Sequence, residues 1–415
     1  MKRMEKAKLE IIQWIEENRE SVIQFVQELV SIPSDNPPGD CYEIAQHIEK
    51  RLKEFEFADI QFLEVDPKEV EANGMIRAAN VVATTQFGDG SGNSIALNAH
   101  GDVVAPGMGW TQDPYGGQIV DGKIYGRGAA VSKSDIATYT FAVMALRKFA
   151  ADLSGEVALA FTFDEEAGGN IGPKWLLDHQ YIKPDMAIAA GFTYSIVNAH
   201  NGCLHLEVKL KGKSAHAAAP HTGNDALEAM TGVLQTIYHY RDSLQAIKSN
   251  IPGIDHPSIV VGLISGGINT NVVPDQCTIR LDRRLIPEED GAKVEAEIRS
   301  LIQEKVKEYE GIEVEITQIL LAHNFGPTPE DTELIKTLGH NWRELMDGEL
   351  MIDGVPLYTD ARHFSQAGIP TVLFGAGPRT LLEANGHRAD EHVRVEDLIK
   401  ATKIVAITLY DLLKK

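Results

Sequence analysis

Short apolar runs that alternate with helical stretches restrict the fold of this chain more than any other feature. The apolar runs are Asn80–Thr84, Ser94–Ala99, Val157–Phe163, Met186–Ala190 and Thr371–Phe374. The stretches with helical periodicity are Glu5–Val30, Tyr42–Phe57, Asp135–Ala151, Ile171–Asp178 and Val395–Leu413. Strands that alternate with helices predict an α/β fold, in which a mixed, mostly parallel sheet lies between two layers of helices.

The middle of the chain has a different pattern. LHLEVKL at Leu204–Leu210 alternates strictly between apolar and polar residues, as a half-buried strand does. The elements that follow are helix Asp225–Leu244, strands Ile259–Ile264 and Cys277–Leu281, helix Ala292–Tyr309 and strand Ile312–Ile316. This βαββαβ order predicts a ferredoxin-like α+β domain at 200–321, inserted into a main α/β domain formed by 1–199 and 322–415.

The net charge excludes some functions. The 415 residues include 39 Lys and Arg and 60 Asp and Glu, so the formal charge is −21. Such a surface repels phosphate backbones and anionic lipids, so we expect neither nucleic acid nor membrane as a partner. No apolar run approaches the ~20 residues that span a bilayer. The spacing of Cys41, Cys203 and Cys277 suits neither a disulfide framework nor a metal cluster, and we expect a cytoplasmic protein.

Polar residues cluster just after two of the predicted strands. His100 and Asp102 lie two residues apart in NAHGDVV, and a carboxylate beside an imidazole commonly supports a metal-bound histidine. Asp164, Glu165 and Glu166 are consecutive in FTFDEEAGG, and adjacent acids repel one another unless solvent or a cation compensates their charge. Each cluster also has a structural interpretation, which for the three acids is a solvated loop. In a site, one carboxylate would bind metal while its neighbour acts as general base.

Two further motifs contain residues with catalytic chemistry. GRGAAVSKSD at Gly126–Asp135 opens a helix, but its glycine spacing matches neither the dinucleotide fingerprint nor the P-loop. GHRADEHV at Gly386–Val393 places His387 beside acids, where it is either a surface histidine or a metal ligand. These two motifs predict no function by themselves.

The four motifs together resemble one family of hydrolases. The chain is similar over nearly its whole length to the zinc-dependent aminoacylases and carboxypeptidases that include acetylornithine deacetylase, succinyl-diaminopimelate desuccinylase and glutamate carboxypeptidase. The other matching stretches are SIPSDNPPGD, WTQDPYGGQIVDGKIYGRGA, GKSAHAAAPHTGNDA, NTNVVPDQCTIRLDRRLIP, YTDARHF and FGAGP. The resemblance implies the same interrupted α/β fold.

The resemblance also implies hydrolysis of an amide bond by two zinc ions that share a water molecule. One ion would lie on His100, and the other on Glu166 and His387. Glu165 matches the general base of the family, and Asp102 matches the carboxylate behind His100. A metal ion lowers the pKa of its bound water towards ~7 and polarises the substrate carbonyl.

Three residues of the inserted domain match further positions of the family. His216 matches a histidine that reaches the active site of the partner subunit and stabilises the oxyanion. Asn271 and Arg284 match positions that hold the carboxylate of the substrate. The implied partners are a small carboxylated substrate and a second copy of this chain, bound through the inserted domain.

Two departures from the family pattern weaken the implied metal site. Val131 stands where the family has an aspartate that bridges both ions, and Gly191 stands where it has an acidic ligand. A catalytic zinc usually has about three protein ligands. The standard two-zinc site therefore cannot form, and we expect one divalent ion, zinc before other metals, or none.

The residues next to Val131 offer limited compensation. Asp135 lies about 6 Å further along the helix, too far to replace the missing ligand unless the helix start shifts. Its alternative role is in a capping box with Ser132 as the N-cap. Lys133 would supply positive charge to a site without metal.

Two functions fit these observations. The first is a hydrolase that cleaves the amide C–N bond of a small carboxylated substrate, such as an N-acyl amino acid or a dipeptide. The second is a divergent family member that performs metal-independent chemistry or binds a ligand without hydrolysing it. The acids and histidines of the motifs favour the hydrolase, whereas Val131 and Gly191 favour the divergent member.

Overall fold

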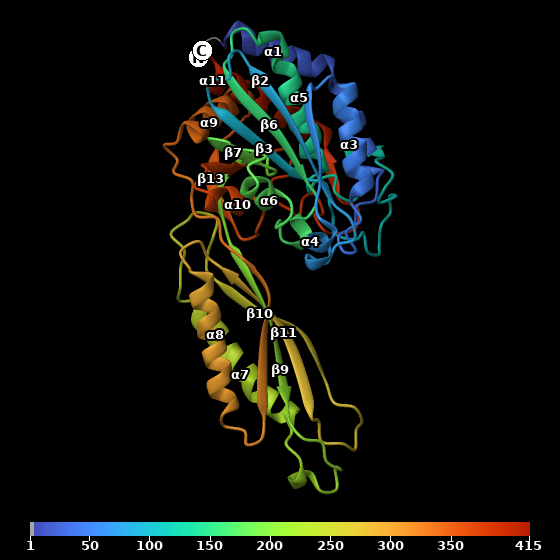
Figure 1. The fold of residues 1–415 in the computed structure, drawn as a ribbon. Coiled ribbons are helices and arrows are strands. Elements are labelled where there is room, and N and C mark those ends of the chain that lie inside the picture. The colour runs from blue at the N-terminus through green and yellow to red at the C-terminus, as the bar shows by residue number, and fades with distance from the viewer. Residues whose placement is uncertain (1–3) are drawn as a thin grey trace. The chain divides into compact units, whose positions relative to one another are not determined.

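The computed structural model describes residues 4–415, which form two units. The centre of the first unit is an eight-stranded mixed sheet (Figure 1). In spatial order the strands are β1 (Asp59–Glu64), β2 (Ala79–Phe87), β6 (Gly155–Thr162), β3 (Ser94–His100), β7 (Met186–Ala189), β14 (Thr371–Leu373), β8 (Ser195–His200) and β13 (Met351–Val355). The central strands β6, β3, β7 and β14 run parallel, whereas β1 pairs antiparallel with β2, β2 with β6, and β8 with β14. The α/β class and the mixed sheet with a parallel centre are confirmed.

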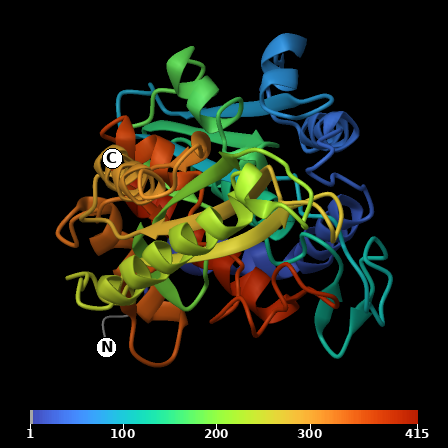
Figure 2. The ribbon, with the colours of Figure 1, turned by 90° about the horizontal axis from the view of Figure 1, so that it is seen from below.

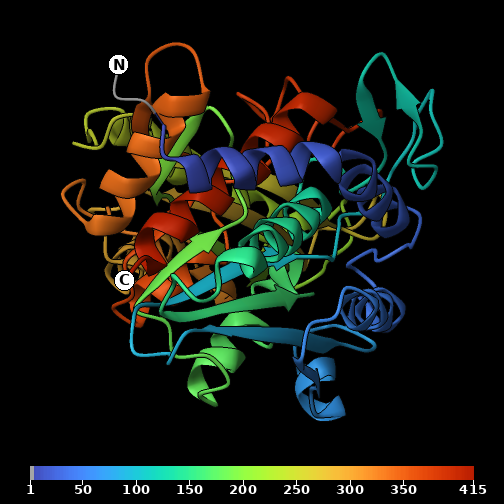
Figure 3. The ribbon, with the colours of Figure 1, turned by 90° about the horizontal axis from the view of Figure 1, so that it is seen from above.

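Helices cover both faces of this sheet. In β6, Val157, Leu159 and Phe161 point into a large core, whereas Ala158 and Ala160 point into a smaller one. The helices over the large core are α1 (Lys6–Glu17), α2 (Arg19–Val30), α3 (Tyr42–Glu54), α5 (Lys133–Leu146), α9 (Glu333–Leu345) and α11 (Val395–Leu413). The helices over the smaller core are α6 (Pro173–Asp178) and α10 (Ala361–Gln366), and the short α4 (Pro67–Ala72) follows β1. Figure 3 shows α1 and α11 on one side of the sheet and the green α6 on the other.

Helix α5 is buried on almost every side. It contacts strands β3 and β6 and the helices α1, α2 and α11, and of its fourteen residues only Met144 is not buried. A helix without a polar face is typical of a protein interior. The hydroxyl of Ser132, just before α5, donates to the backbone oxygen of His100 (3.1 Å), so the start of α5 lies against the end of β3.

A small three-stranded sheet connects two distant motifs. Its strands are β15 (His392–Arg394), β5 (Lys123–Tyr125) and β4 (Ile119–Val120). The antiparallel pairing of β15 with β5 brings GHRADEHV beside GRGAAVSKSD. The backbone N–H of Gly126 donates to the backbone oxygen of Glu391 (2.9 Å) at this contact.

The second unit is a four-stranded antiparallel sheet with two helices on one face (Figures 1 and 2). In spatial order the strands are β10 (Ser258–Gly266), β11 (Gln276–Leu285), β9 (Gly202–Lys211) and β12 (Glu313–Ala322), and the helices are α7 (Ala226–Leu244) and α8 (Gly291–Val306). This order and the βαββαβ sequence of elements are those of the predicted ferredoxin-like fold. The unit comprises Ala199–Pro327 and Asp353–Tyr358, whereas the sequence analysis placed the inserted domain at 200–321.

The N-terminal helices differ from the prediction. The stretch of helical periodicity at Glu5–Val30 forms two helices, α1 and α2, because the chain leaves helical geometry at Asn18. The Asn18 side-chain amide donates to the backbone oxygen of Trp14 (2.8 Å), a local bond with which asparagine competes against helix continuation. Among the helices of residues 4–415, none combines the length and the apolar character needed to cross a membrane.

Candidate active site

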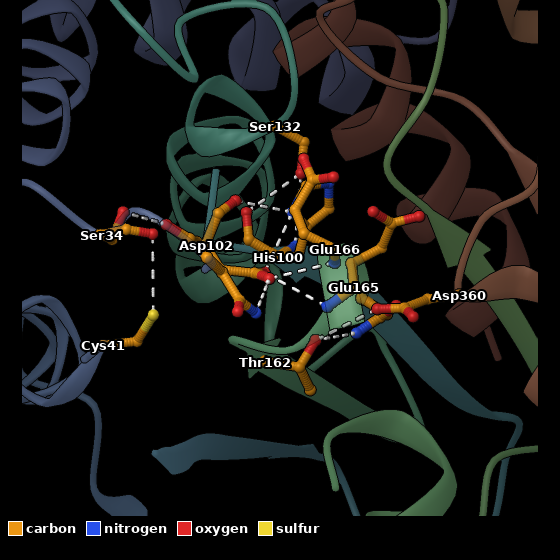
Figure 4. A network of polar contacts seen from close by, with 12 residues as sticks. Ser34, Cys41, His100, Asp102, Ser132, Thr162, Glu165, Glu166 and Asp360 are labelled. Atoms are coloured by element: carbon orange, nitrogen blue, oxygen red, sulfur yellow. Dashed lines mark hydrogen bonds and ion pairs between the residues drawn. The ribbon is translucent and has the colours of Figure 1, made fainter. Parts of the chain in front are cut away.

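The candidate site lies at the carboxyl ends of the parallel strands β3 and β6. His100 ends β3 and pairs with Thr162, which ends β6. Asp102 and Glu165 follow in the loops directly after these strands. The carboxyl ends of neighbouring parallel strands meet at one edge of the sheet, where α/β proteins commonly bind ligands. The structure therefore brings the HGD and DEE motifs together, as Figure 4 shows.

Asp102 is fully buried and connects the two motifs. Its Oδ1 lies 3.3 Å from His100 Nδ1. Its carboxylate accepts hydrogen bonds from the side-chain amide of Asn36 (2.9 Å) and from the backbone N–H groups of Glu166 (3.1 Å) and Glu165 (3.3 Å). Asp102 therefore orients the imidazole and also anchors the loop that carries both glutamates (Figure 4).

The surroundings raise the pKa of both members of the central pair, that of Glu165 in the same direction as burial and that of His100 against it. Burial is the main reason that the pKa of Glu165 is raised to about 8, and the charges of Glu166 and Asp102 act in the same direction while His100 opposes them. Burial lowers the pKa of His100, but its contact with Asp102 and the charges of both glutamates raise that pKa well above its usual range. A proton on His100 thus compensates part of the negative charge of the cluster.

His387 joins this cluster from a loop near the C-terminus. Its Nε2 lies 3.3 Å from Glu166 Oε1, and 51% of its side chain is exposed. The contact with Glu166 raises the pKa of His387, although burial opposes the shift. The backbone of His387 has a positive φ of 60°, as have Asn385 (53°) and Asp390 (59°). Such backbone geometry is unfavourable for these residues and persists only where the surrounding structure holds it.

A buried ion pair holds the His387 loop against the start of α5. Arg127 Nη1 lies 2.5 Å from Glu391 Oε2, and both side chains are buried. Glu391 Oε1 accepts the backbone N–H groups of Ala130 (3.0 Å) and Val131 (3.1 Å). The carboxylate of Glu391 therefore orders the segment that contains Val131.

The backbone around Gly191 leaves no room for a side chain. A Cβ atom at this position would lie 2.7 Å from Leu373 Cβ and 2.7 Å from the backbone nitrogen of Phe374. Because these are atoms of a buried strand end, they cannot move aside as the tip of a flexible side chain does. The acidic ligand that the resemblance implies at this position is thus incompatible with this backbone.

Asp135 lies beside Gly191 and is not part of a helix cap. Its Oδ1 accepts the backbone N–H of Ala376 (2.6 Å), and its Oδ2 accepts that of Gly191 (3.2 Å). The predicted capping box is wrong, because Ser132 makes no capping hydrogen bond and instead pairs with the backbone of His100. Burial raises the pKa of Asp135 to about 7. With both oxygens engaged, Asp135 ties together the loops after β7 and β14, which favours a structural role over a metal-binding one.

Lys133 is buried close to this network. Its ammonium group donates to the backbone oxygen of Ile32 (2.8 Å). Burial lowers the pKa of Lys133 to about 8. That Lys133 supplies charge to a metal-free site stays a prediction.

The structure adds two residues that the sequence analysis did not assign, Asp360 and Arg362. Asp360 accepts a hydrogen bond from the hydroxyl of Thr162 (3.4 Å), and burial together with the charge of Glu165 raises its pKa to about 7 (Figure 4). Arg362 donates to the backbone oxygen of Gly168 in the loop after β6. An acid and an arginine two residues apart in YTDARHF were the available signal.

The residues predicted in the second unit lie in two places. His216 and Asn271 are exposed on adjoining loops, where the backbone N–H of Ala217 donates to the backbone oxygen of Asn271 (3.0 Å). Arg284 lies near the far end of β11, and its guanidinium donates to both carboxylate oxygens of Asp282 (3.0 and 3.1 Å). The structure brings His216 and Asn271 together, and Arg284 lies apart from them.

Comparison with known proteins decides the family. The model of peptidase family M20/M25/M40 matches residues 96–411, which include the ends of β3 and β6 and the His387 loop. The chain belongs to this peptidase family. The family predicted from the motifs is confirmed.

Relatives of this M20 peptidase chain include named hydrolases of C–N bonds. An uncharacterized metallohydrolase of Methanococcus maripaludis is 26% identical, over 93% of this chain and 97% of the relative. Acetylornithine deacetylase of Myxococcus xanthus is 29% identical, over 80% of this chain and 83% of the relative. The crystal structure of human carnosine dipeptidase 1 has the same fold, with a TM-score of 0.76, 18% identity and 99% of each chain covered. The prediction of an enzyme that hydrolyses C–N bonds is confirmed at the level of the family.

The residues of this chain do not fit the two-ion centre implied for the family. Among residues 4–415, the metal-binding atoms of His100, Glu166 and His387 do not form a group in which all lie within 4.8 Å of one another. His387 Nε2 and Glu166 Oε1 lie 3.3 Å apart. The side chain of Val131, however, has no atom that can bind a metal, and position 191 has no room for a side chain that could. The M20 peptidase fold is thus present with an incomplete set of ligands.

Proposed function

We propose that this M20 peptidase chain hydrolyses the amide C–N bond of a small carboxylated substrate, such as an N-acyl amino acid or a dipeptide. The supporting observation is the partly buried Glu165, whose loop is anchored by Asp102 beside His100 and Glu166. Structural loops do not ordinarily gather so many acids, because their mutual repulsion is unfavourable in a buried place. A site that must move protons needs groups of this kind.

In the proposed reaction, Glu165 is the general base. Its carboxylate takes a proton from the water that attacks the substrate carbonyl carbon, and a new C–O bond forms. The C–N bond then breaks, and Glu165 returns the proton to the departing nitrogen. Asp102 holds the imidazole of His100 and the backbone of Glu165 in position throughout. The proposed proton transfers need only Glu165 and water, since the residues present do not fit the two-ion centre.

We propose at most one divalent ion at this site, zinc before other metals. Glu166 and His387 are the two ligands that lie within contact of each other. An imidazole and a carboxylate suit zinc. Two protein ligands alone bind an ion weakly, so loss of any bound metal on chelation is expected.

A second copy of the chain is the proposed partner, bound through the second unit. Strand β10 is an edge of its sheet, and Val260, Leu263 and Ile264 on this strand are exposed. An apolar edge strand is prone to pair with another chain. His216 is proposed to stabilise the oxyanion in the partner's site, and Asn271 and Arg284 to bind the substrate carboxylate. Sedimentation of the full chain as a monomer would contradict the dimer.

A second candidate function is ligand binding without hydrolysis. It is favoured by the closed packing around Gly191, which excludes an acidic ligand, and by Val131 in place of the bridging aspartate. In this case the candidate site would bind N-acyl amino acids or dipeptides without cleaving them. The two functions differ in whether Glu165 governs turnover.

Replacement of Glu165 tests the proposed hydrolysis. Glu165→Gln is expected to lower kcat by about 10²–10⁴-fold, because it removes the base and keeps the shape of the side chain. Release of free amine from a panel of N-acyl amino acids and dipeptides measures turnover. Glu156→Gln is the matched control, since Glu156 lies near the start of β6, at the opposite end from the loop that carries Glu165.

Calorimetry with the same panel separates the two functions. Binding of a panel compound by the wild type without release of amine would favour the second function. Equal turnover in the wild type and in Glu165→Gln would remove Glu165 from the mechanism.

A further inference from the structure

One face of the second unit's sheet carries a cluster of metal-binding side chains. On β9, Leu204, Leu206 and Val208 point towards helices α7 and α8, so Cys203 and His205 lie on the opposite face. In the antiparallel register, Asp282 of β11 is directly opposite His205. Side chains directly opposite each other in neighbouring strands are in contact range. The pairing therefore places a thiol, an imidazole and a carboxylate at one point.

The distances within this cluster are those of a metal-ligand set. Cys203 Sγ lies 3.1 Å from His205 Nε2 and 3.7 Å from Asp282 Oδ2, and His205 Nε2 lies 3.0 Å from Asp282 Oδ2. Tetrahedral zinc with ordinary bond lengths to sulfur, nitrogen and oxygen holds its donor atoms about 3.3–3.6 Å apart. Small adjustments of these side chains would thus enclose an ion. Among residues 4–415, this is the one group of three such donors within 4.8 Å of one another.

We propose that Cys203, His205 and Asp282 form a binding site for zinc or a chemically similar divalent transition metal. Thiolate and imidazole ligands select such ions over calcium and magnesium, which prefer oxygen. Three protein ligands leave a fourth position open to water. This site lies wholly within the second unit, whereas His100, Glu166 and His387 belong to the first.

Charge and exposure at the cluster suit a divalent ion. A thiolate and a carboxylate together balance its two positive charges. The side chains of His205 and Asp282 are 34% and 32% exposed, which leaves a path for the ion, whereas Cys203 is buried beneath them. The carboxylate of Asp282 is held in place by hydrogen bonds with His205 and Arg284.

Arg284 acts as the outer partner of the carboxylate ligand. Its Nε donates to Asp282 Oδ1 (3.0 Å) and its Nη2 donates to Oδ2 (3.1 Å). A metal ion on Oδ2 leaves the bond from Nε to Oδ1 in place. Partners of this kind hold a ligating carboxylate in its orientation, and their loss weakens metal binding by about 10–100-fold.

Cobalt(II) titration of the full chain tests this site, because cobalt occupies zinc sites and a thiolate ligand gives it a charge-transfer absorption in the near ultraviolet. The chain is first treated with a chelator and then titrated with cobalt. We expect this absorption in the wild type and its disappearance when zinc displaces the cobalt. Cys203→Ser should abolish it, and His205→Asn should weaken cobalt binding by at least about 100-fold, more than the loss of an outer partner.

Two control variants locate the absorption. Cys277→Ser should keep it, because Cys277 lies on the helix-covered face of the same sheet. Glu166→Gln should also keep it, because Glu166 lies in the first unit. Circular dichroism and thermal melting establish that each variant is folded. If Cys203→Ser does not fold, Asp282→Asn is used instead, and its cobalt affinity is expected to be lower than that of the wild type.

Three results would overturn the proposal. They are a wild type without the thiolate absorption at saturating cobalt, an absorption that persists after Cys203 is replaced, and cobalt affinity in His205→Asn or Asp282→Asn equal to that of the wild type. Any of these results would mean that the three side chains form a hydrogen-bonded cluster and not a metal site.

Discussion

Asparagine at position 135 keeps the shape of the buried aspartate and removes its charge. In the wild type, the two carboxylate oxygens of Asp135 accept the backbone N–H groups of Ala376 (2.6 Å) and Gly191 (3.2 Å). An asparagine has one acceptor oxygen, so one of these N–H groups loses its partner. Asp135→Asn therefore removes a buried carboxylate and leaves one buried backbone N–H without an acceptor.

The two effects of Asp135→Asn have opposite signs, and pH separates them. One unsatisfied buried N–H costs about 1–3 kcal/mol of stability at any pH. The pKa of Asp135 is raised by burial from its ordinary 3.8 to about 7. Between these values the unfolded chain has lost the proton that the folded chain keeps, so the wild type loses about 1.4 kcal/mol of stability per pH unit as pH rises. The whole loss is about 4 kcal/mol, and the asparagine variant does not share it.

The stability difference between wild type and Asp135→Asn is thus expected to change sign. At pH 4 the variant should be less stable by about 1–3 kcal/mol, and at pH 8 it should be more stable by a similar amount. Urea unfolding, followed by tryptophan fluorescence at intervals from pH 4 to pH 8, measures the difference. Thr140→Val is the matched control, because Thr140 is buried in the same helix, does not titrate, and hydrogen-bonds only within it, to the backbone oxygen of Ile136.

The control variant should differ from the wild type by the same amount at every pH. A difference between Asp135→Asn and the wild type that also stayed constant from pH 4 to pH 8 would refute the reasoning. It would show that the fold accepts an ionised Asp135 without penalty.

Two other substitutions test the network around the site. Val131→Asp places a carboxylate where the resemblance implies a bridging ligand, so the variant should retain one more equivalent of zinc than the wild type. Elemental analysis after gel filtration measures the zinc content. An unchanged zinc content would show that the missing carboxylate does not limit metal binding. Arg127→Met leaves the buried carboxylate of Glu391 without its charged partner, so the free energy of unfolding in urea should fall by about 3–5 kcal/mol. A loss below about 1 kcal/mol would show that the buried Glu391 does not need the charge of Arg127.

Local patterns in the sequence were enough to predict most of the core elements. The closing helix expected at Val395–Leu413 has these same bounds in α11. The strict alternation of Leu204–Leu210 predicted β9, because one face of that strand packs against α7 and α8 while the other does not. The edge strand β1 of the first sheet was missed, because DIQFLE is only half buried and its pattern is too weak to predict a strand.

The site was predictable where its residues follow strands directly. His100 and Glu165 could be placed together from sequence, since the ends of parallel strands share one edge of the sheet. The roles of Asp360 and Asp135 could not be predicted, because each depends on a contact with a distant segment. Asp135 meets Ala376, 241 residues further along the chain.

By itself, the sequence determined most of the helices and strands, because periodicity expresses the short-range geometry of the backbone. Its motifs determined the family and the chemical groups available to the site. Only the tertiary structure decided that position 191 has no room for a ligand and that Asp135 is held by two backbone N–H groups. It also decided that Asp282 meets His205 across 77 residues of sequence. These contacts depend on strand register and on close packing between distant segments, and neither leaves a periodic trace in the segments themselves.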